Sequence, residues 1–239
     1  MKILAFIPAR AKSNRIKNKN MTLLNKKPLI YYTLNILKKI KKDVFPFIST
    51  DSKSIKKYCE KFGFQNDYLR PKHVSEDSTS MFKTLNHAIK WLKVYKGLKF
   101  DAVLLLQPTS PIRNLNDIQS AIYQFKRRKL KSLVSVIPMK EHPYSCIKFR
   151  KNRLSFLTNK NIKNFTNTQL HEKDYYFVDG SFYLAKIDFL LKNRNFLNER
   201  HTKVFIQKLK WPIDIDEPED LLFTDIFLKN RKLKKILFR

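Results

Sequence analysis

Two aspartates near the carboxyl end of the chain have the spacing of a divalent-metal site. In the segment "PIDIDEPEDL" (212–221), Asp214 and Asp216 alternate with isoleucines, which is the period of a β-strand with one apolar and one polar face. Two carboxylates on one face of a strand suit a hard cation such as Mg²⁺. Helix N-terminal charge is the alternative role for acidic residues here, and it fits Glu217 and Glu219 better than Asp214. The pattern therefore predicts Asp214 and Asp216 as metal ligands.

A strongly basic segment follows the first apolar run of the chain. In "ILAFIPARAKSNRIKNKN" (3–20), an apolar run leads directly into a series of Arg and Lys side chains. Such a loop offers backbone amides and cationic side chains together, as a polyphosphate requires. It contains no glycine, so it differs from both glycine-rich nucleotide loops, and a solvated loop in a lysine-rich protein is the alternative. The candidate phosphate-binding residues are Arg10, Ser13, Arg15, Lys19 and Asn20.

Polar side chains also follow the most apolar run in the middle of the chain. "LLLQPTSPIR" (104–113) ends that run with Gln107, Thr109, Ser110 and Arg113. Two prolines restrict the backbone there, so these polar side chains are expected to point from a fixed loop into a crevice. A rigid turn with a capping serine is the alternative interpretation.

A third polar segment, "YLRPKHVSEDST" (68–79), offers Arg70, Asp77 and Ser78. On its own, this pattern favours a polar loop with a helix cap over a binding site. Nothing in the sequence resembles a Ser-His-Asp or Cys-His nucleophilic set, so no covalent enzyme intermediate is expected.

Strand and helix patterns alternate through the first 139 residues. Short apolar runs predict buried strands, and apolar residues at helical spacing predict amphipathic helices between them. The expected strands cover residues 2–9, 44–50, 100–111 and 132–139, and the expected helices cover residues 28–40, 52–63, 81–96 and 115–129. This alternation predicts an α/β fold with a mostly parallel sheet and helices on both faces.

The predicted sheet also indicates where a ligand would bind. Ligands of open α/β sheets bind at the carboxyl ends of the strands. The loops after Ala9, Thr50, Gln107 and Met139 should therefore surround one crevice. The basic segment is the first of these loops, so its positive charge would face the bound ligand.

The periodicity weakens between residues 140 and 175, where the chain is polar and rich in Lys, Asn and Thr. We expect an inserted hairpin or dimerisation lobe there. A strand is expected at 177–185, and residues 211–230 should form a short strand and a final helix. Because there is no internal repeat and no low-complexity linker, residues 1–239 are expected to form a single domain that carries this small lobe.

The formal net charge of +30 is the usual electrostatic footprint of a nucleic-acid-binding protein. However, the lysines are spread along the whole chain and alternate with core-type residues, which favours a compositional bias instead. We therefore expect no specific nucleic-acid partner. No apolar run reaches the roughly 20 residues of a membrane span, and the first run is too short for a signal peptide, so a cytoplasmic protein is expected.

Five motifs, in this order and at these spacings, resemble those of the acylneuraminate cytidylyltransferases, also called CMP-sialic acid synthetases. The motifs are "IPARAKSNRIKNKN", "STD" (49–51), "LRP" (69–71), "LLQPTSPIR" and "IDIDEPEDL", and the similarity extends over residues 2–228. The resemblance implies a Rossmann-like nucleotidyltransferase fold and a homodimer in which part of the lobe crosses to the partner subunit. It also implies the Mg²⁺-dependent reaction of CTP with a nine-carbon 2-keto sugar acid, which gives the CMP-sugar and pyrophosphate.

The resemblance also implies roles for individual residues. The residues that match the family's nucleotide-binding motifs are Arg10, Ser13, Lys19, Asn20, Arg70 and Asp77, and the implied catalytic residues are Arg10, Lys19 and Asp216. On the side of the sugar and ribose, the matching residues are Gln107, Thr109, Ser110, Gln169, Asp179 and Gly180. Asp214 and Asp216 match the family's metal pair.

The sequence departs from the family pattern in two places. Family members usually have glycine in the first loop, where this chain reads "AKSNR" (11–15), so Lys12 or Arg15 is expected to compensate. Sialic-acid enzymes tend to read NGAIY where this chain reads "DGSFY" (179–183), which favours legionaminic or pseudaminic acid over N-acetylneuraminate. The alternatives are a CMP-Kdo synthetase, whose members usually have Lys-Pro in place of Lys19-Asn20, a basic nucleic-acid-binding protein, and a catalytically silent relative that binds only nucleotide.

Overall fold

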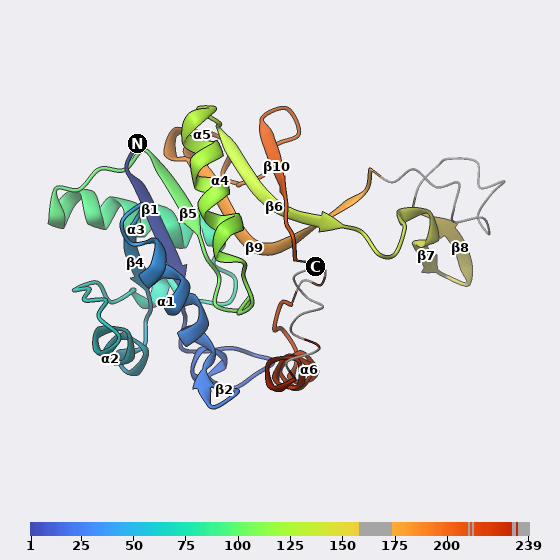
Figure 1. Ribbon diagram of the computed structural model, residues 1–239, viewed down its shortest axis with the longest axis horizontal. Coiled ribbons are helices and arrows are strands. Elements are labelled where there is room, and N and C mark those ends of the chain that lie inside the picture. The colour runs from blue at the N-terminus through green and yellow to red at the C-terminus, as the bar shows by residue number, and fades with distance from the viewer. Residues whose placement is uncertain (158–173, 210, 212, 231–232, 234–239) are drawn as a thin grey trace.

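The computed structural model describes residues 1–157, 174–209, 211, 213–230 and 233, and its centre is a six-stranded sheet of order β10–β6–β9–β5–β1–β4 (Figure 1). β1 pairs in parallel with β4 and β5, and β6 pairs in parallel with β10, whereas β9 is antiparallel to both of its neighbours. The predicted α/β fold with a mostly parallel sheet is therefore confirmed. The strands are β1 (Ile3–Pro8), β4 (Phe45–Ser49), β5 (Ala102–Leu105), β6 (Ser132–Pro138), β9 (Tyr176–Lys186) and β10 (Thr202–Ile206).

Helices cover both faces of the sheet, as the alternating sequence pattern predicts. Side-chain oxygens at several amino ends accept from N–H groups that a helix leaves free, as Ser80 does from Lys83 N at the start of α3. The same helix ends at Gly97, whose φ of +62° is the left-handed conformation typical of a helix C-terminus. The helices are α1 (Leu29–Ile40), α2 (Lys53–Lys61), α3 (Met81–Lys96), α4 (Leu115–Arg127), α5 (Ile187–Asn193) and α6 (Pro218–Lys229).

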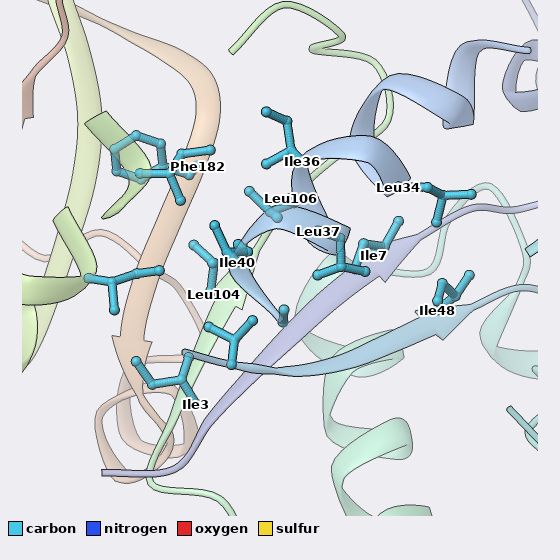
Figure 2. Close-up of a cluster of buried hydrophobic side chains, with 14 of the residues drawn as sticks. Ile3, Ile7, Leu34, Ile36, Leu37, Ile40, Ile48, Leu104, Leu106 and Phe182 are labelled. Atoms are coloured by element: carbon cyan, nitrogen blue, oxygen red, sulfur yellow. The ribbon is translucent and has the colours of Figure 1, made fainter. Parts of the chain in front are cut away.

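Alternate residues of β1 point to opposite faces of the sheet and enter two separate cores. Ile3, Ala5 and Ile7 pack with residues of α1, α2 and α4 on one face (Figure 2). Leu4 and Phe6 pack with residues of α3 and α5 on the other face. Each fully buried Ile, Leu or Phe side chain stabilises the fold by roughly 1.5–3 kcal/mol relative to an exposed one. The two cores thereby fix the central strands and the points at which the following loops leave the sheet.

The chain leaves the sheet between β6 and β9. After a short 3₁₀ turn, β7 (Ile147–Arg150) and β8 (Arg153–Phe156) form an antiparallel hairpin that projects away from the main body (Figure 1). This hairpin lies within the range 140–175, where the sequence predicts an inserted hairpin or lobe.

The structure differs from the sequence-based expectation in two respects. The sequence does not predict α5 or β10; α5 is short, and β10 is an edge strand with exposed apolar and charged residues and lacks the signature of a buried strand. The short strand predicted at the start of 211–230 does not form in the described residues there. No helix among the described residues is long and apolar enough to cross a membrane.

Candidate active site

A cleft of about 300 Å³ opens at the carboxyl ends of β1 and β5, beside the segment that follows β4. It is lined by the first loop, by residues 70–84 and by the loop after β5. The structure thus brings together residues that are up to about two hundred positions apart in the sequence, as the position of a ligand site in an open α/β sheet requires. The predicted site residues that line this cleft are Arg10, Ser13, Lys19, Asn20, Arg70, Asp77, Gln107, Thr109 and Asp216.

The loop after β6 does not line this cleft, contrary to the expectation from the sequence. β9 is inserted in antiparallel direction between β5 and β6, so the carboxyl end of β6 is one strand farther away. Beyond β6 the chain continues to the projecting hairpin (Figure 1), and Met139 N donates to the Tyr175 carbonyl at 3.0 Å. The loop directly after Thr50 does not line the cleft either, and the cleft is formed by the loops after β1 and β5, by residues 70–84 and by Asp216.

The glycine-free first loop is held by carboxylates. The amide of Ala11 donates to Oδ1 of Asp51 at 2.7 Å, which ties the first loop to the loop after β4. The guanidinium of Arg10 forms an ion pair with Asp77, from the segment between α2 and α3. Among residues 10–20, Asn18 alone has a positive φ (+52°), and asparagine tolerates this left-handed conformation, so the loop adopts its path without glycine.

Lys19 lies buried beneath the first loop and is hydrogen-bonded to residues 213–217, which we call the acidic segment. Its Nζ donates to the Ile215 carbonyl at 2.8 Å, to Oδ1 of Asp216 at 2.8 Å and to the Asp216 carbonyl at 3.3 Å. Since an ammonium has three N–H groups, these contacts use all of its donors in this structure. The neighbouring Asn20 is also buried, and its Nδ2 donates to the Arg10 carbonyl at 2.9 Å.

The two aspartates have different electrostatic surroundings. Hydrogen bonding from Lys19 lowers the pKa of Asp216, and Arg15, whose Nη1 lies 3.4 Å from Oδ2 of Asp216, lowers this pKa further. Asp214 is exposed as a residue, but partial burial of its carboxyl group raises the pKa of Asp214, and the negative charge of Asp216 raises it as well, while hydrogen bonding with Thr109 acts in the opposite direction. Asp216 is thus compensated by cations of the protein, whereas the charged form of Asp214 is less stabilised.

These two carboxylates fit a divalent cation. The buried side chains of Ile213 and Ile215 alternate with the exposed Asp214 and Asp216, which places the acidic pair on one side of the segment although no strand forms. Within the part of the chain that the structure describes, no group of three His, Cys, Asp or Glu side chains could enclose a metal. Mg²⁺ is commonly held by one or two carboxylates together with substrate phosphates and water, so the donor set suits it.

The loop after β5 connects the cleft with the acidic segment and with β9. Gln107 and Thr109 line the cleft, and the carbonyl of Thr109 accepts a hydrogen bond from Ile215 N at 2.8 Å. Ser110 is buried, and its Oγ donates to the Gly180 carbonyl at 3.2 Å. Two of the predicted sugar-side residues therefore face the cleft, while Ser110 supports the loop from below.

Asp179 and Arg113 point into the protein, although the sequence analysis predicted both on the crevice. Asp179 is only 3% exposed, and its Oδ2 accepts from Oγ of Ser181 at 2.5 Å and from Nε2 of Gln207. Arg113 is buried next to the same strand and donates from Nε to the Ser181 carbonyl at 2.6 Å. Gln207 cannot be singled out from the sequence, because a single glutamine after an edge strand without a clear strand pattern belongs to no motif.

An irregularity in β9 explains why these side chains turn inward. Val134 is paired with Tyr183, but two residues later Val136 is paired with Val178, so β9 contains extra residues between these pairs. Gly180 lies in this stretch with a φ of +76°, a left-handed conformation that favours glycine. Regular alternation along a strand cannot predict which residues face the crevice beyond such a point. The predicted substrate residue Gln169 lies outside the described residues.

Arg70 forms part of the opposite wall of the cleft. Its backbone N–H donates to the Thr50 carbonyl at 2.7 Å, and its Nη2 donates to the Ser49 carbonyl. Burial lowers the pKa of Arg70, and Asp51 opposes that shift. Its Nε has no hydrogen-bond partner among the described residues, so a buried donor is left at this wall of the cleft.

A larger hollow of about 700 Å³ lies between α5 and residues 198–201. Its charged lining mixes lysines and an arginine with Asp188 and Glu199, and it contains none of the residues that the sequence analysis singled out. Volume alone therefore does not identify the site. The convergence of cations and carboxylates at the ends of β1 and β5 does.

Comparison with known sequences gives a consistent result. A family model described as Cytidylyltransferase matches residues 4–221. The chain is 32% identical over 229 residues to CMP-N,N'-diacetyllegionaminic acid synthase of Legionella pneumophila, covering 94% of this chain and 95% of that protein. It is 28% identical over 238 residues to pseudaminic acid cytidylyltransferase of Campylobacter jejuni, covering 96% of this chain and 97% of that protein.

Comparison with solved structures shows that the fold is shared with other nucleotidyltransferases. CMP:2-keto-3-deoxy-manno-octonic acid synthetase, solved in complex with CTP, matches with a TM-score of 0.67 at 15% identity, over 96% of this chain and 99% of that one. 4-diphosphocytidyl-2C-methyl-D-erythritol synthase of Anaerococcus prevotii matches with a TM-score of 0.64 at 15% identity, over the same shares of the two chains. At these identities the similarity is one of fold.

Proposed function

The chain belongs to the cytidylyltransferase family, and from this premise we propose that it joins CMP from CTP to the anomeric hydroxyl of a nine-carbon 2-keto sugar acid. Sialic, legionaminic and pseudaminic acids are the candidate acceptors. The proposal is carried by the cleft in which the cations of the first loop meet Asp216 at the ends of β1 and β5. A nucleoside triphosphate with its divalent cation needs both kinds of group within one cleft.

In the proposed reaction, the anomeric oxygen of the sugar attacks the α-phosphorus of CTP. A new P–O bond forms to the sugar, and the bond between the α-phosphorus and the oxygen that bridges to the β-phosphate breaks. Pyrophosphate leaves with that electron pair, and the proton of the sugar hydroxyl passes to the solvent. Because no covalent enzyme intermediate is required, the residues of the cleft act by position and charge.

Arg10 is the cation best placed to bind the β- and γ-phosphates. Its side chain is 36% exposed and is held at the cleft by the single carboxylate of Asp77. A triphosphate carries more negative charge than one carboxylate and would replace Asp77 as the partner of Arg10. Lys19 has its donors on the acidic segment, so we assign it the support of Asp216 from behind, with direct phosphate contact as the alternative.

Asp214 and Asp216 are the proposed ligands of Mg²⁺. When bound, this ion would neutralise phosphate charge and increase the electrophilicity of the α-phosphorus. The pairing of Lys19 and Arg15 with Asp216 reduces the repulsion between the two carboxylates and keeps both on one side of their segment. Electron paramagnetic resonance of Mn²⁺, used in place of Mg²⁺, would test this directly, because replacing both aspartates by Asn should abolish binding.

Pyrophosphate release is the experiment that tests the proposed function. The chain would be incubated with CTP, Mg²⁺ and, in turn, N-acetylneuraminic, legionaminic, pseudaminic and Kdo sugars. CTP-dependent release with one nine-carbon acid is the expected result, and the names of the relatives favour legionaminic or pseudaminic acid. Release with Kdo alone would favour the eight-carbon alternative. Silence with every sugar while CTP still binds would support a catalytically silent relative.

We also propose a homodimer that forms through the projecting hairpin. The register of β7 and β8 pairs Ile147 with Phe156 and Phe149 with Leu154, so four apolar side chains share one face. All four are exposed, from 40% for Phe156 to 68% for Phe149. An apolar face on a projecting element is typical of a protein–protein interface. Analytical ultracentrifugation should give twice the chain mass of 28.6 kDa, and Phe149→Asp should shift it towards the monomer.

We propose the cytoplasm as the site of the reaction, since CTP is supplied there. The net charge of +30 is the one feature that favours the rival class, a nucleic-acid-binding protein. Fluorescence anisotropy with duplex DNA would separate the two. We expect only weak binding at physiological ionic strength, whereas tight binding with a steep salt dependence would favour the rival.

A further inference from the structure

Arg113 is a buried cation that joins three separate elements. Its residue is 6% exposed. Nε donates to the Ser181 carbonyl of β9 at 2.6 Å, and Nη1 donates to Oγ1 of Thr33 in α1 at 3.0 Å. Nη2 donates to the carbonyl of Gln107, at the point where the chain leaves β5. A guanidinium carries its donors in a rigid fork, so these three acceptors are held in a fixed geometry relative to one another.

Burying this charge is costly, which makes a purely space-filling role a poor explanation. Burial lowers the pKa of Arg113 to about 10, while the carboxylates of Asp179 and Asp214 act in the opposite direction. The side chain therefore stays protonated at neutral pH. Replacing buried ionic groups by well-packed apolar residues is often neutral or stabilising, so stability alone does not account for this residue. The fixed geometry that the guanidinium imposes on its three acceptors accounts for the presence of Arg113.

The clamped loop leads directly to the acidic pair. Two residues after Gln107, the carbonyl of Thr109 accepts a hydrogen bond from Ile215 N at 2.8 Å. The Thr109 side chain also acts on Asp214, since it lowers the pKa of that carboxyl. The acidic segment forms no strand in this region, so its contact with the loop helps to set where its carboxylates lie, together with the bonds from Lys19, the capping bonds to Asp220 and the packing of Ile213 and Ile215.

We propose that Arg113 is a positioning residue: it clamps the loop after β5 between α1 and β9 and thereby fixes the segment that carries Asp214 and Asp216. It touches neither substrate nor the reacting atoms. The inference rests on the proposed function only in so far as these two carboxylates serve the transfer reaction.

Three variants separate positioning from a general loss of stability. Arg113→Lys keeps the charge but cannot reproduce the three-way fork. Thr33→Val removes only the contact to α1 and leaves both carbonyl contacts of Arg113 possible. Arg127→Lys makes the same exchange at an exposed position of α4 and is the matched control. Thermal unfolding of all three gives the stability against which the other readouts are compared.

Amide hydrogen exchange and Mn²⁺ affinity are the primary readouts, because neither requires turnover. In Arg113→Lys we expect the Ile215 amide to exchange about tenfold faster, since its partner loop opens more often. The dissociation constant of Mn²⁺, measured by electron paramagnetic resonance, should rise about tenfold, as for other residues that orient metal ligands. With an active sugar, kcat should fall about tenfold and KM for CTP should change by less than about twofold.

The outcomes that overturn the proposal are distinct. Unchanged Ile215 exchange and Mn²⁺ affinity in Arg113→Lys, relative to Arg127→Lys, would exclude positioning. Exchange that rises in Arg113→Lys by the same factor at Ile215 and at amides throughout the sheet would attribute the change to stability instead, whereas Thr33→Val, which loses one of the three contacts, should give the smaller effect. Wild-type chain with a protected Ile215 and tight Mn²⁺ binding, but no pyrophosphate release with any sugar, would contradict the proposed function and leave the positioning role intact.

A measurement on the wild type decides the matter if Arg113→Lys does not fold. The amide of Ser110, which donates to the Gln107 carbonyl at 3.3 Å, reports on the clamped loop. If the loop and the acidic segment form one unit, native-state exchange should give the amides of Ser110 and Ile215 the same free energy of opening. Clearly different values would show that the loop does not hold the segment, and the proposal would fall.

Discussion

Replacing Lys19 by Met should lower the free energy of unfolding by at least as much as it lowers the free energy of CTP binding. The ammonium donates to the buried carbonyl of Ile215 and to the backbone and side chain of Asp216. Methionine keeps most of the length of the side chain but leaves these acceptors without a donor. A hydrogen bond that involves a charged group contributes roughly 1.5–3 kcal/mol when it is buried.

The expected loss is near the lower end of that range. The side chain of Asp216 is 52% exposed and keeps Arg15 as a partner, so water can replace part of the lost ion pair. The carbonyl of Ile215 has no such replacement, because the residue is fully buried. We therefore expect Lys19→Met to cost about 2 kcal/mol, which for a chain of this size lowers the midpoint of thermal unfolding by about 4–8 °C.

The assay compares Lys19→Met with Lys17→Met, which removes the same charge from an exposed position of the same loop. Thermal unfolding is followed by circular dichroism at low and high salt, and CTP binding by calorimetry. The difference between the variants should persist in high salt, because a buried contact is screened much less than a surface charge. The reasoning is refuted if the two variants unfold at the same temperature while only Lys19→Met loses CTP binding. In that case Lys19 would be a phosphate ligand with no structural role.

Three further results are expected. Asp216→Ala should remove most of the pyrophosphate release while circular dichroism stays unchanged; near-normal turnover would contradict the metal assignment. Gly180→Ala should lower the midpoint of unfolding by about 2–4 °C, since the φ of +76° costs a side chain roughly 1 kcal/mol; an unchanged midpoint would count against that strain. Burial lowers the pKa of His87, and so does the charge of His73, so the unfolded chain takes up its proton first as the pH falls below the ordinary value of about 6.5. Urea titrations should therefore show stability declining from pH 7 to pH 5, and His87→Gln should flatten the decline; an equally steep decline in the variant would contradict the role of His87.

The central sheet could be predicted because its strands are buried on both faces. β1 and β5 read as short runs of apolar residues, since helices cover them from both sides. β10 escapes the same reasoning, because it is an edge strand whose Val204 and Ile206 are exposed and whose other residues are partly polar. Apolar runs in a sequence indicate burial. An exposed edge strand mixes apolar and polar residues, as a loop does, so the sequence does not distinguish the two.

The acidic segment shows what alternation can and cannot predict. The period of two correctly separates buried Ile213 and Ile215 from exposed Asp214 and Asp216. It does not supply a neighbouring strand, and the amide of Ile215 is bonded to a loop carbonyl. The prediction that the two aspartates lie on the side opposite to the isoleucines was therefore confirmed. The prediction of a strand was wrong, because a strand needs a neighbouring strand that the local sequence does not encode.

The partners of individual site residues could not be predicted, because they come from remote parts of the chain. Lys19 bonds to residues 196 and 197 positions later, and the motif that suggested phosphate binding contains no trace of that contact. Asp179 points inward because β9 loses its regular pairing at that point. Location at the ends of the strands follows from the fold class, whereas orientation depends on contacts that only the folded chain defines.

The charge of the first loop has a structural purpose as well as a proposed chemical one. Arg10 is paired with Asp77, and both Arg15 and Lys19 are paired with Asp216, so three cations of the loop bind acidic residues of two remote segments. Exposed ion pairs contribute little to stability, but the contact of Lys19 is buried and holds its segment firmly. The buried strand β1 fixes one end of the loop, and Lys19 fixes the other. Positive charge directly behind a buried strand therefore holds Asp216 at the cleft, and a triphosphate would meet cations whose positions are already set.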